Sequence, residues 1–153
     1  MILYLFSSAF GNGEAIPADY TADGRDISPP LQWDSLPPET ESLALVCEDP
    51  DAPVGNWVHW VVYNIPPERK VLPEGISADE EVLEDGTTQG ENSWGRIGYG
   101  GPSPPSGTHR YFFRLYALDT SLDLEHGLTS DELRAAFEGH VVEQAELMGR
   151  YGR

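Results

Sequence analysis

Several residue types are scarce in this 153-residue chain, and each scarcity excludes a class of protein. A single cysteine, Cys47, excludes an internal disulfide, and its place in the apolar run 42–47 is typical of a small buried core residue. No run approaches the roughly 20 apolar residues of a membrane-spanning helix, so no integral membrane association is expected. The apolar residues 1–10 carry no basic segment and no small-residue cleavage site. We therefore expect no signal peptide and a cytoplasmic location.

Basic residues are also few. Nine lysines and arginines against 26 aspartates and glutamates give a net charge of −17, and Lys70 is the only lysine. A surface of this sign repels the phosphates of nucleic acids and anionic lipid headgroups, so neither is expected as a partner. The excess of acid is compatible with a halophilic source and equally with an ordinary solvated surface. Because charges are screened beyond roughly 8 Å at physiological salt, a bound anion would have to be attracted by nearby groups.

Short apolar segments, separated by proline, glycine and aspartate, run through most of the chain. They predict strands over residues 1–6, 31–33, 43–47, 57–65 and 110–118. The acidic segment 66–91 is typical of a solvated loop. Alternation along the strand 57–65 places five residues on one face: Trp57, His59, Val61, Tyr63 and Ile65. Both faces of this strand are largely apolar, so His59 is expected on a sheltered side of the sheet.

Helical patterns occur only near the end of the chain. Thr129 followed three residues later by Glu132 is a capping box, and residues 133–137 then carry an apolar stripe at helical spacing. Residues 141–149 predict a second short helix. Strands first and helices last predict a mainly β fold, an antiparallel β-sandwich with short peripheral C-terminal helices, in a single domain over residues 1–153.

Two rigid, polar clusters form the candidate site. In the first, Asp49 and Asp51 flank a proline, and His59 follows in an aromatic strand. If the backbone stays extended through the proline, the two carboxylates project to the same side. Taken alone, the pair is more simply explained as turn chemistry at a strand end.

The second cluster, residues 98–111, is rich in glycine and proline and includes Pro104 and Pro105. It leads into His109, Arg110 and Tyr111. On a strand, His109 and Tyr111 share a face, and Arg110 points away from them. Arg110 is therefore expected to support the site or to pair with a carboxylate from behind.

Three chemistries suit these residues. A metal site is weakly indicated, because no closely spaced histidine pair or cysteine pair is present. Acid–base catalysis would need a nucleophile, and neither Ser103 nor Ser106 lies in a Gly-x-Ser-x-Gly turn. Binding of an anion or polar headgroup would use histidine N–H groups, the tyrosine hydroxyl and backbone amides freed by Gly100, Gly101 and Gly107. This third chemistry uses the most residues. His126 and His140 lack such a setting and are interpreted as surface or helix-packing residues.

Several of these segments together carry a family resemblance. They are residues 20–24 (Tyr-Thr-Ala-Asp-Gly), 28–33 (Ser-Pro-Pro-Leu-Gln-Trp), 49–53 (Asp-Pro-Asp-Ala-Pro), 59–60 (His-Trp), 98–102 (Gly-Tyr-Gly-Gly-Pro) and 107–111 (Gly-Thr-His-Arg-Tyr). With these motifs spread nearly end to end, the chain resembles the phosphatidylethanolamine-binding proteins, also called Raf kinase inhibitor proteins, in their bacterial and archaeal branch.

The resemblance implies a large antiparallel sheet packed on a smaller one, with a pocket for phosphate-like groups, including phosphoethanolamine, at one end. Carried onto this sequence, it implies a ligand site without catalytic residues, metal or cofactor. The implied ligand-binding residues are Asp49, Asp51, His59, Pro104, Pro105, His109 and Tyr111, with Arg110 behind them. It also implies a cis proline near the site, for which the bond between Ala52 and Pro53 is the candidate.

The sequence therefore predicts a non-catalytic binding module for a small anionic ligand or phosphorylated headgroup. The alternative is a protease or kinase inhibitor that acts through protein contacts, with the loop 66–91 as its candidate surface. A hydrolase using Asp51 with His109 is the third reading. Because prokaryotic relatives include homodimers, the apolar positions of the C-terminal helices could serve a partner chain, although a core role for that stripe is favoured.

Overall fold

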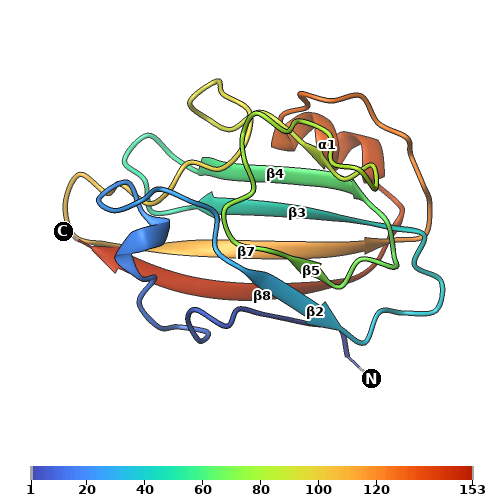
Figure 1. Ribbon diagram of the computed structural model, residues 1–153, viewed down its shortest axis with the longest axis horizontal. Coiled ribbons are helices and arrows are strands. Elements are labelled where there is room, and N and C mark those ends of the chain that lie inside the picture. The colour runs from blue at the N-terminus through green and yellow to red at the C-terminus, as the bar shows by residue number, and fades with distance from the viewer. Residues whose placement is uncertain (1, 153) are drawn as a thin grey trace.

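Two antiparallel sheets and one α-helix form three layers in the computed structural model, which describes residues 2–152 (Figure 1). The small sheet has the order β1-β2-β5, with β1 at Tyr4–Phe6, β2 at Leu31–Asp34 and β5 at Val71–Leu72. The large sheet has the order β6-β4-β3-β7-β8. Its strands are β6 (Thr88–Gln89), β4 (Trp57–Ile65), β3 (Ser42–Asp49), β7 (Thr108–Leu118) and β8 (Val141–Gly152). The helices are α1 (Ser130–Phe137) and a short 3-10 helix at Ala18–Tyr20.

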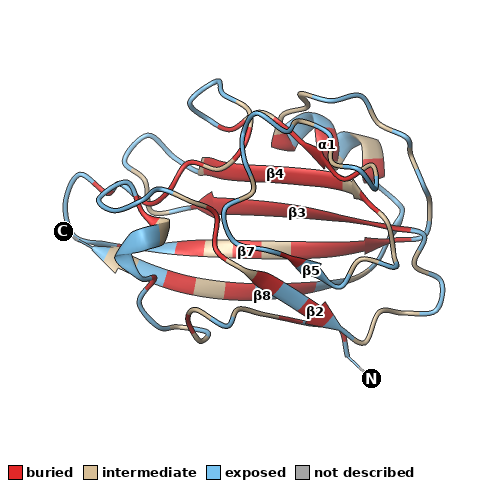
Figure 2. Cartoon of the chain, in the orientation of Figure 1, coloured by how far each residue is buried: buried red, intermediate tan, exposed pale blue. Residues whose placement is uncertain are grey.

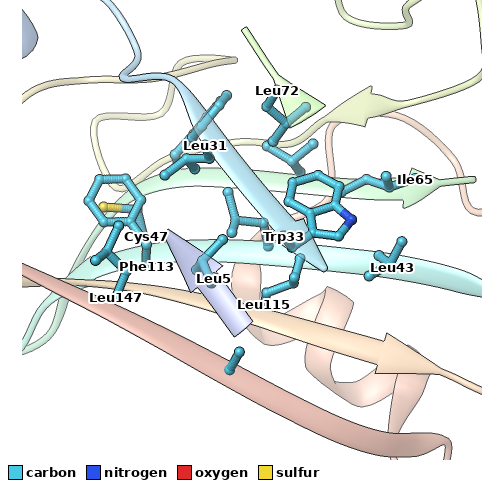
Figure 3. Packing of buried hydrophobic residues seen from close by; sticks show 14 of the residues in the cluster. Leu5, Leu31, Trp33, Leu43, Cys47, Ile65, Leu72, Phe113, Leu115 and Leu147 are labelled. Carbon is cyan, nitrogen blue, oxygen red and sulfur yellow. The ribbon is translucent and has the colours of Figure 1, made fainter. Parts of the chain in front are cut away.

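The central strand β3 of the large sheet is buried on both faces because a different layer covers each one. All eight residues of β3 are buried, and its side chains alternate between two apolar clusters (Figure 2). Leu43, Leu45 and Cys47 face the small sheet, where they pack with Trp33 and Leu5 (Figure 3). This continuous apolar run is what a strand covered on both sides requires.

The other face of the large sheet packs against α1. Ala44 and Val46 of β3 lie in one cluster with Leu133 and Phe137 of the helix. The capping box is confirmed: Thr129 accepts a hydrogen bond from the Glu132 amide, and the Glu132 carboxylate accepts one from the Thr129 amide. The predicted apolar stripe of the helix therefore serves the core of its own chain, and the proposed partner chain stays a prediction.

The predicted strands are confirmed with small changes at their ends. The segment 57–65 matches β4, and the strand predicted from residue 1 begins at Tyr4, with Met1 outside the described residues. The acidic segment 66–91 is mainly loop, although the two-residue strands β5 and β6 lie within it. Cys47 is buried as expected.

The predicted second helix over residues 141–149 is wrong, because this segment is the strand β8, hydrogen-bonded along β7. Ala145, Leu147 and Gly149 are buried while the residues between them are more exposed, which is a period of two. Gly139, at φ 85°, ends the helical region, and the β-branched pair at residues 141–142 favours a strand. The apparent helical spacing came from counting the exposed valines as core positions.

The predicted single face of β4 is wrong for His59 and Ile65, because two β-bulges shift the alternation: Val61 and Tyr63 lie in the cluster under α1, whereas Ile65 lies in the cluster between the sheets. Cys47 pairs with Trp60 and Glu48 with Val58, which leaves His59 as the extra residue. Val58 consequently joins the cluster under α1, whereas the His59 ring lies against Tyr111, a member of the cluster between the sheets. The bulge is the reason that His59 faces the cavity described next.

No cis peptide bond occurs among residues 2–152, so the predicted cis bond before Pro53 is wrong. The turn after β3 closes with a hydrogen bond from the Gly55 amide to the Ala52 carbonyl at 3.0 Å. Gly55 adopts φ 104°, a conformation open to glycine. The reversal in chain direction is thus made by glycine rather than by a cis proline.

Candidate functional site

A cavity of about 280 Å³ lies at the end of the large sheet where β3 ends and β4 and β7 begin. Its carboxylate and imidazole groups come from the strands, and its apolar lining comes mostly from the loops that follow β3 and precede β7. The lining residues are Asp49, Ala52, Pro53, Val54, Trp57, His59, Trp94, Ser103, Pro104, Pro105, His109 and Tyr111.

Asp49 and His109 form a buried pair in this cavity, with His109 Nδ1 2.7 Å from Asp49 Oδ2. Asp49 follows Cys47 by one strand period, and His109 precedes Tyr111 by one period. All four side chains therefore point to the same side of the sheet. A carboxylate only accepts hydrogen bonds, so Nδ1 of His109 is the donor. The nitrogen that this ring can offer to a ligand is Nε2.

His59 is held in the same way by a backbone carbonyl. Its Nδ1 lies 2.6 Å from the Gly100 carbonyl oxygen, which can only accept, so Nδ1 again carries the proton. The side chain is 3 % exposed. Burial lowers the pKa of His59 below its ordinary 6.5 and outweighs the opposing effects of the Gly100 carbonyl and Asp49. At neutral pH this ring is therefore uncharged.

Aromatic rings build one wall of the cavity. The Trp94 ring meets both Trp57 and His59 edge to face, with ring centroids 5.5 Å and 5.0 Å apart. The Tyr111 ring also contacts His59 edge to face, with ring centroids 5.1 Å apart. Pro104 and Pro105 line the cavity, as the resemblance implies. Two rings thus contact the His59 imidazole directly, and Trp57 packs against one of them.

A family model described as phosphatidylethanolamine-binding protein matches residues 6–152. The chain belongs to the phosphatidylethanolamine-binding protein family. It is 54 % identical over 149 residues to a UPF0098 protein of Methanothermobacter thermautotrophicus, covering 97 % of this chain and 98 % of the relative. It is 49 % identical over 150 residues to a UPF0098 protein of Pyrococcus horikoshii, covering 96 % of this chain and 75 % of that one.

Solved structures share the fold of this family member. A phosphatidylethanolamine-binding protein homologue from Chlamydia trachomatis superposes with a TM-score of 0.91 at 43 % identity, over 99 % of this chain and 98 % of the other. Escherichia coli YbcL, described as a member of the mammalian family, superposes with a TM-score of 0.92 at 29 % identity, over 100 % and 99 % of the two chains. The mainly β architecture expected from the motifs is therefore confirmed.

Asp51 and Arg110 lie outside the cavity lining of this family member. Strand β3 ends at Asp49, and Asp51 sits in the following turn, where its amide donates to Asp49 Oδ1. The expectation that both carboxylates project into one site is thus wrong. Arg110 donates to Asp51 from its backbone amide, Nε and Nη2, and these hydrogen bonds lower the pKa of Asp51 to about 2. The prediction that Arg110 pairs with a carboxylate behind the site is confirmed.

The backbone amides expected to face a ligand are engaged elsewhere. The Gly100 amide donates to the His59 carbonyl at 3.0 Å, and the Gly101 amide donates to Asp26 Oδ1 at 2.7 Å. Gly107 is at φ 72° and does not line the cavity. Gly100 and Gly101 instead allow close packing: a Cβ on Gly100 would lie 2.4 Å from Cζ3 of Trp94, and one on Gly101 would lie 2.7 Å from the Tyr20 carbonyl oxygen.

Sequence reasoning missed Trp94 and Asp26. Trp94 lies in a loop with no periodic pattern, and its only signal is that Gly100 leaves room for its ring. His126 and His140 are exposed and pair with Glu81 and Asp119, in agreement with their surface assignment. Among residues 2–152, no cluster of three or more His, Cys, Asp or Glu residues could hold a metal ion. No helix in that range is long and apolar enough to cross a membrane.

Proposed function

We propose that this protein is a non-catalytic binding module whose cavity takes a small phosphate-like anion, such as the phosphoethanolamine headgroup. One observation carries the proposal. Two buried histidines line the same small cavity, and each has its Nδ1 engaged by the protein. Both rings can therefore present Nε2 to one ligand, and protonated Nε2 is a good donor to a phosphate oxygen.

The charge of the lining limits the ligand. None of the lining residues is a lysine or an arginine, and the chain as a whole carries −17. An anion must consequently be held by protonated imidazole and by neutral donors, so binding is expected to take up a proton. When His109 is protonated, its charge lies against the Asp49 carboxylate. A proton taken up by His109 with the anion would therefore lie next to a carboxylate that stabilises it.

The size and the apolar wall limit the ligand further. A volume of about 280 Å³ is at the small end for ligand pockets. The two tryptophans and the loop Ala52–Val54 supply apolar surface next to the histidines. This combination suits a headgroup or another small phosphate ester, with the charged end at the histidines and the organic end at the rings.

The hydrolase alternative has less support. Asp51 is bound to Arg110 outside the cavity lining, so it is not placed to act there with His109. Ser103 lines the cavity, but among residues 2–152 no hydrogen bond joins its hydroxyl to either histidine. Inhibition of a protease or kinase, with residues 66–91 as the candidate surface, stays a prediction, as does a cytoplasmic location.

The test is an NMR titration with inorganic phosphate and with phosphoethanolamine, following the ring signals of all four histidines. We expect saturable shifts at His59 and His109, with His126 and His140 as internal references. The variant His109→Asn keeps a donor for Asp49 but lacks Nε2, and it should bind phosphate more weakly. His140→Asn is the matched control, because His140 Nδ1 also bonds to an aspartate, Asp119, on the surface. If His59 and His109 do not shift at millimolar ligand, the proposal is wrong.

A further inference from the structure

We propose that Asp26 is a positioning residue for His59 and acts on it through one peptide group. Asp26 does not line the cavity, and it stands 33 positions earlier in the chain. In this role it strengthens the hydrogen bond that keeps the proton on Nδ1 of His59 and leaves Nε2 for the ligand. The inference deepens the proposed anion-binding function and rests on it for its consequence, but the arrangement itself can be tested without any ligand.

The connection is a chain of two hydrogen bonds. The Gly101 amide donates to Asp26 Oδ1 at 2.7 Å, and the Gly100 carbonyl accepts from His59 Nδ1 at 2.6 Å. That amide and that carbonyl belong to the same peptide unit. A carboxylate on the N–H side draws the proton towards itself and makes the carbonyl oxygen a stronger acceptor, because hydrogen bonds in a chain polarise one another.

The consequence for His59 follows from the chemistry of a neutral imidazole. Only one of its two nitrogens carries a proton, and a hydrogen bond to one nitrogen decides which. A polarised Gly100 carbonyl favours the proton on Nδ1 and leaves Nε2 facing the ligand. When an anion binds, Nε2 can then take up the second proton and donate it to an anion oxygen, while the polarised carbonyl stabilises the charged ring through Nδ1. Asp49 does the same for His109 directly, at 2.7 Å. The cavity thus has two histidines with the same tautomer, each set by a carboxylate.

The local structure is built around this contact. Asp26 adopts φ 55°, in the left-handed region that residues with a side chain seldom occupy. A Cβ on Gly101 would lie 2.7 Å from Asp26 Oδ1, so glycine is required at that end of the contact. Two further bonds hold the same segments together: Tyr99 hydroxyl to the Tyr20 carbonyl at 2.6 Å, and the Ala22 amide to the Pro102 carbonyl at 3.0 Å.

The experiment is ¹⁵N NMR of the histidine ring nitrogens in the ligand-free protein, above pH 7. In wild type we expect His59 to be protonated on Nδ1. In Asp26→Asn the side-chain oxygen can still accept a hydrogen bond from the Gly101 amide, but the negative charge of the carboxylate is lost. In that variant the hydrogen bond from His59 Nδ1 to the Gly100 carbonyl should weaken, so the ¹⁵N and ¹H signals of the His59 Nδ1–H group should move, and those of His109 should not move. Asp19→Asn is the matched control, since it removes one charge from the same loop.

Affinity supplies the second readout. Inorganic phosphate is expected to bind Asp26→Asn about fivefold more weakly than wild type, the size of one weakened hydrogen bond, and Asp19→Asn with unchanged affinity. Loss of affinity with unchanged His59 ring signals would overturn the inference, because Asp26 would then act only on loop structure. Shifted ring signals without any phosphate binding in wild type would keep the positioning role and refute the proposed function instead.

A wild-type measurement covers the case in which Asp26→Asn does not fold. Scalar coupling across the hydrogen bond should connect His59 Nδ1 with the Gly100 carbonyl carbon, and a second coupling should connect the Gly101 amide nitrogen with the Asp26 carboxyl carbon. Detection of both couplings supports the chain of hydrogen bonds. If either is absent while the coupling between His109 Nδ1 and the Asp49 carboxyl carbon is seen in the same sample, the inference is wrong.

Discussion

His109 donates through Nδ1 to Asp49 Oδ2 at 2.7 Å, in a pair whose side chains are 9 % and 5 % exposed. The two residues come from neighbouring antiparallel strands, β7 and β3, that are 60 positions apart in the chain. Their pairing turns an imidazole ring into a donor of fixed orientation at the end of a sheet. The predictions that follow test this pair, the second histidine and the structure that surrounds them.

The first prediction concerns Asp49→Asn. Two effects oppose each other: loss of the carboxylate removes a repulsion on the anion, but it also removes the partner of a protonated His109. The second effect should dominate because the carboxylate is 2.7 Å from the ring nitrogen, whereas an anion at Nε2 lies across the ring.

We therefore expect phosphate affinity at pH 6 to fall about tenfold, measured by calorimetry. Asp119→Asn, at the exposed pair with His140, is the control and should leave affinity unchanged. Tighter binding by Asp49→Asn would show that repulsion dominates.

The second prediction concerns stability against pH. Burial lowers the pKa of His59 in the folded state below its value near 6.5 in the unfolded chain. Below pH 6.5 the unfolded chain then binds a proton more readily, so the folded state loses stability as the pH falls. The contribution of His59 to the free energy of unfolding is complete above pH 6.5. Below that pH the free energy of unfolding falls by at most about 1.4 kcal/mol per pH unit.

Chemical denaturation between pH 5 and pH 7.5 checks this effect. In His59→Asn, whose amide can still donate to the Gly100 carbonyl, the dependence of unfolding free energy on pH should be flatter than in wild type. His126→Asn removes an exposed histidine and should follow the wild-type curve. Parallel curves for wild type and His59→Asn would contradict the prediction.

The third prediction concerns Glu48, which is 2 % exposed on the face towards α1. It accepts hydrogen bonds from Arg114, from Arg134 of α1 at 2.8 Å and from Asn56 at 2.7 Å. Burial raises the pKa of this carboxyl, but the bonds from Arg134, Asn56 and Arg114 outweigh it and lower the pKa.

Because Glu48→Ala leaves two arginines without their buried partner, we expect the free energy of unfolding to fall by about 3 kcal/mol. Glu146→Ala is the control. Glu146 is the other partner of Arg114, and its side chain is 46 % exposed. Its removal should therefore lower the free energy of unfolding by less than about 1 kcal/mol. Urea denaturation measures the free energy of unfolding of both variants. Equal losses would show that the buried Glu48 stabilises the fold no more than the exposed Glu146.

The fourth prediction concerns the aromatic wall. In Gly100→Ala the new methyl group would lie 2.4 Å from Cζ3 of Trp94, so the half-exposed indole must move away. We expect a loss of about 1–3 kcal/mol in unfolding free energy and a change in tryptophan fluorescence. In a Trp94→Ala background the clash is absent, so the same substitution should cost much less. Additive effects in this double-mutant cycle would show that the two residues do not interact.

Local sequence patterns predicted most of the strands and the helix, because burial along a strand and capping of a helix depend on residues that are close in the chain. The run 43–47 is apolar throughout since both faces of β3 are covered, and the Thr129–Glu132 capping box involves atoms three residues apart. Where the local pattern was ambiguous, the prediction was wrong. Residues 141–149 have apolar side chains at both helical and strand spacing, and only pairing along β7 selects the strand.

The candidate site was predicted in part for the same reason. Asp49, His59 and His109 were recognised because they stand beside prolines and glycines in motifs shared with a family. The cis bond before Pro53 and the ligand-facing glycine amides were carried over by analogy or expected from composition, and neither is present among the described residues. Asp51 was grouped with Asp49 by spacing, but a turn redirects it to Arg110.

The sequence by itself determined the family and most of the strands, through alternating or continuous apolar residues. It also identified the histidines and carboxylates of the candidate binding site. The tertiary structure alone decided that a bulge turns His59 into the cavity, that Trp94 forms a wall, and that Asp26 reaches His59 through one peptide group. The physical reason is distance along the chain. Periodicity describes neighbours within a few residues, whereas the hydrogen bonds of this site join residues 41 to 75 positions apart, whose meeting depends on the packing of the whole sandwich.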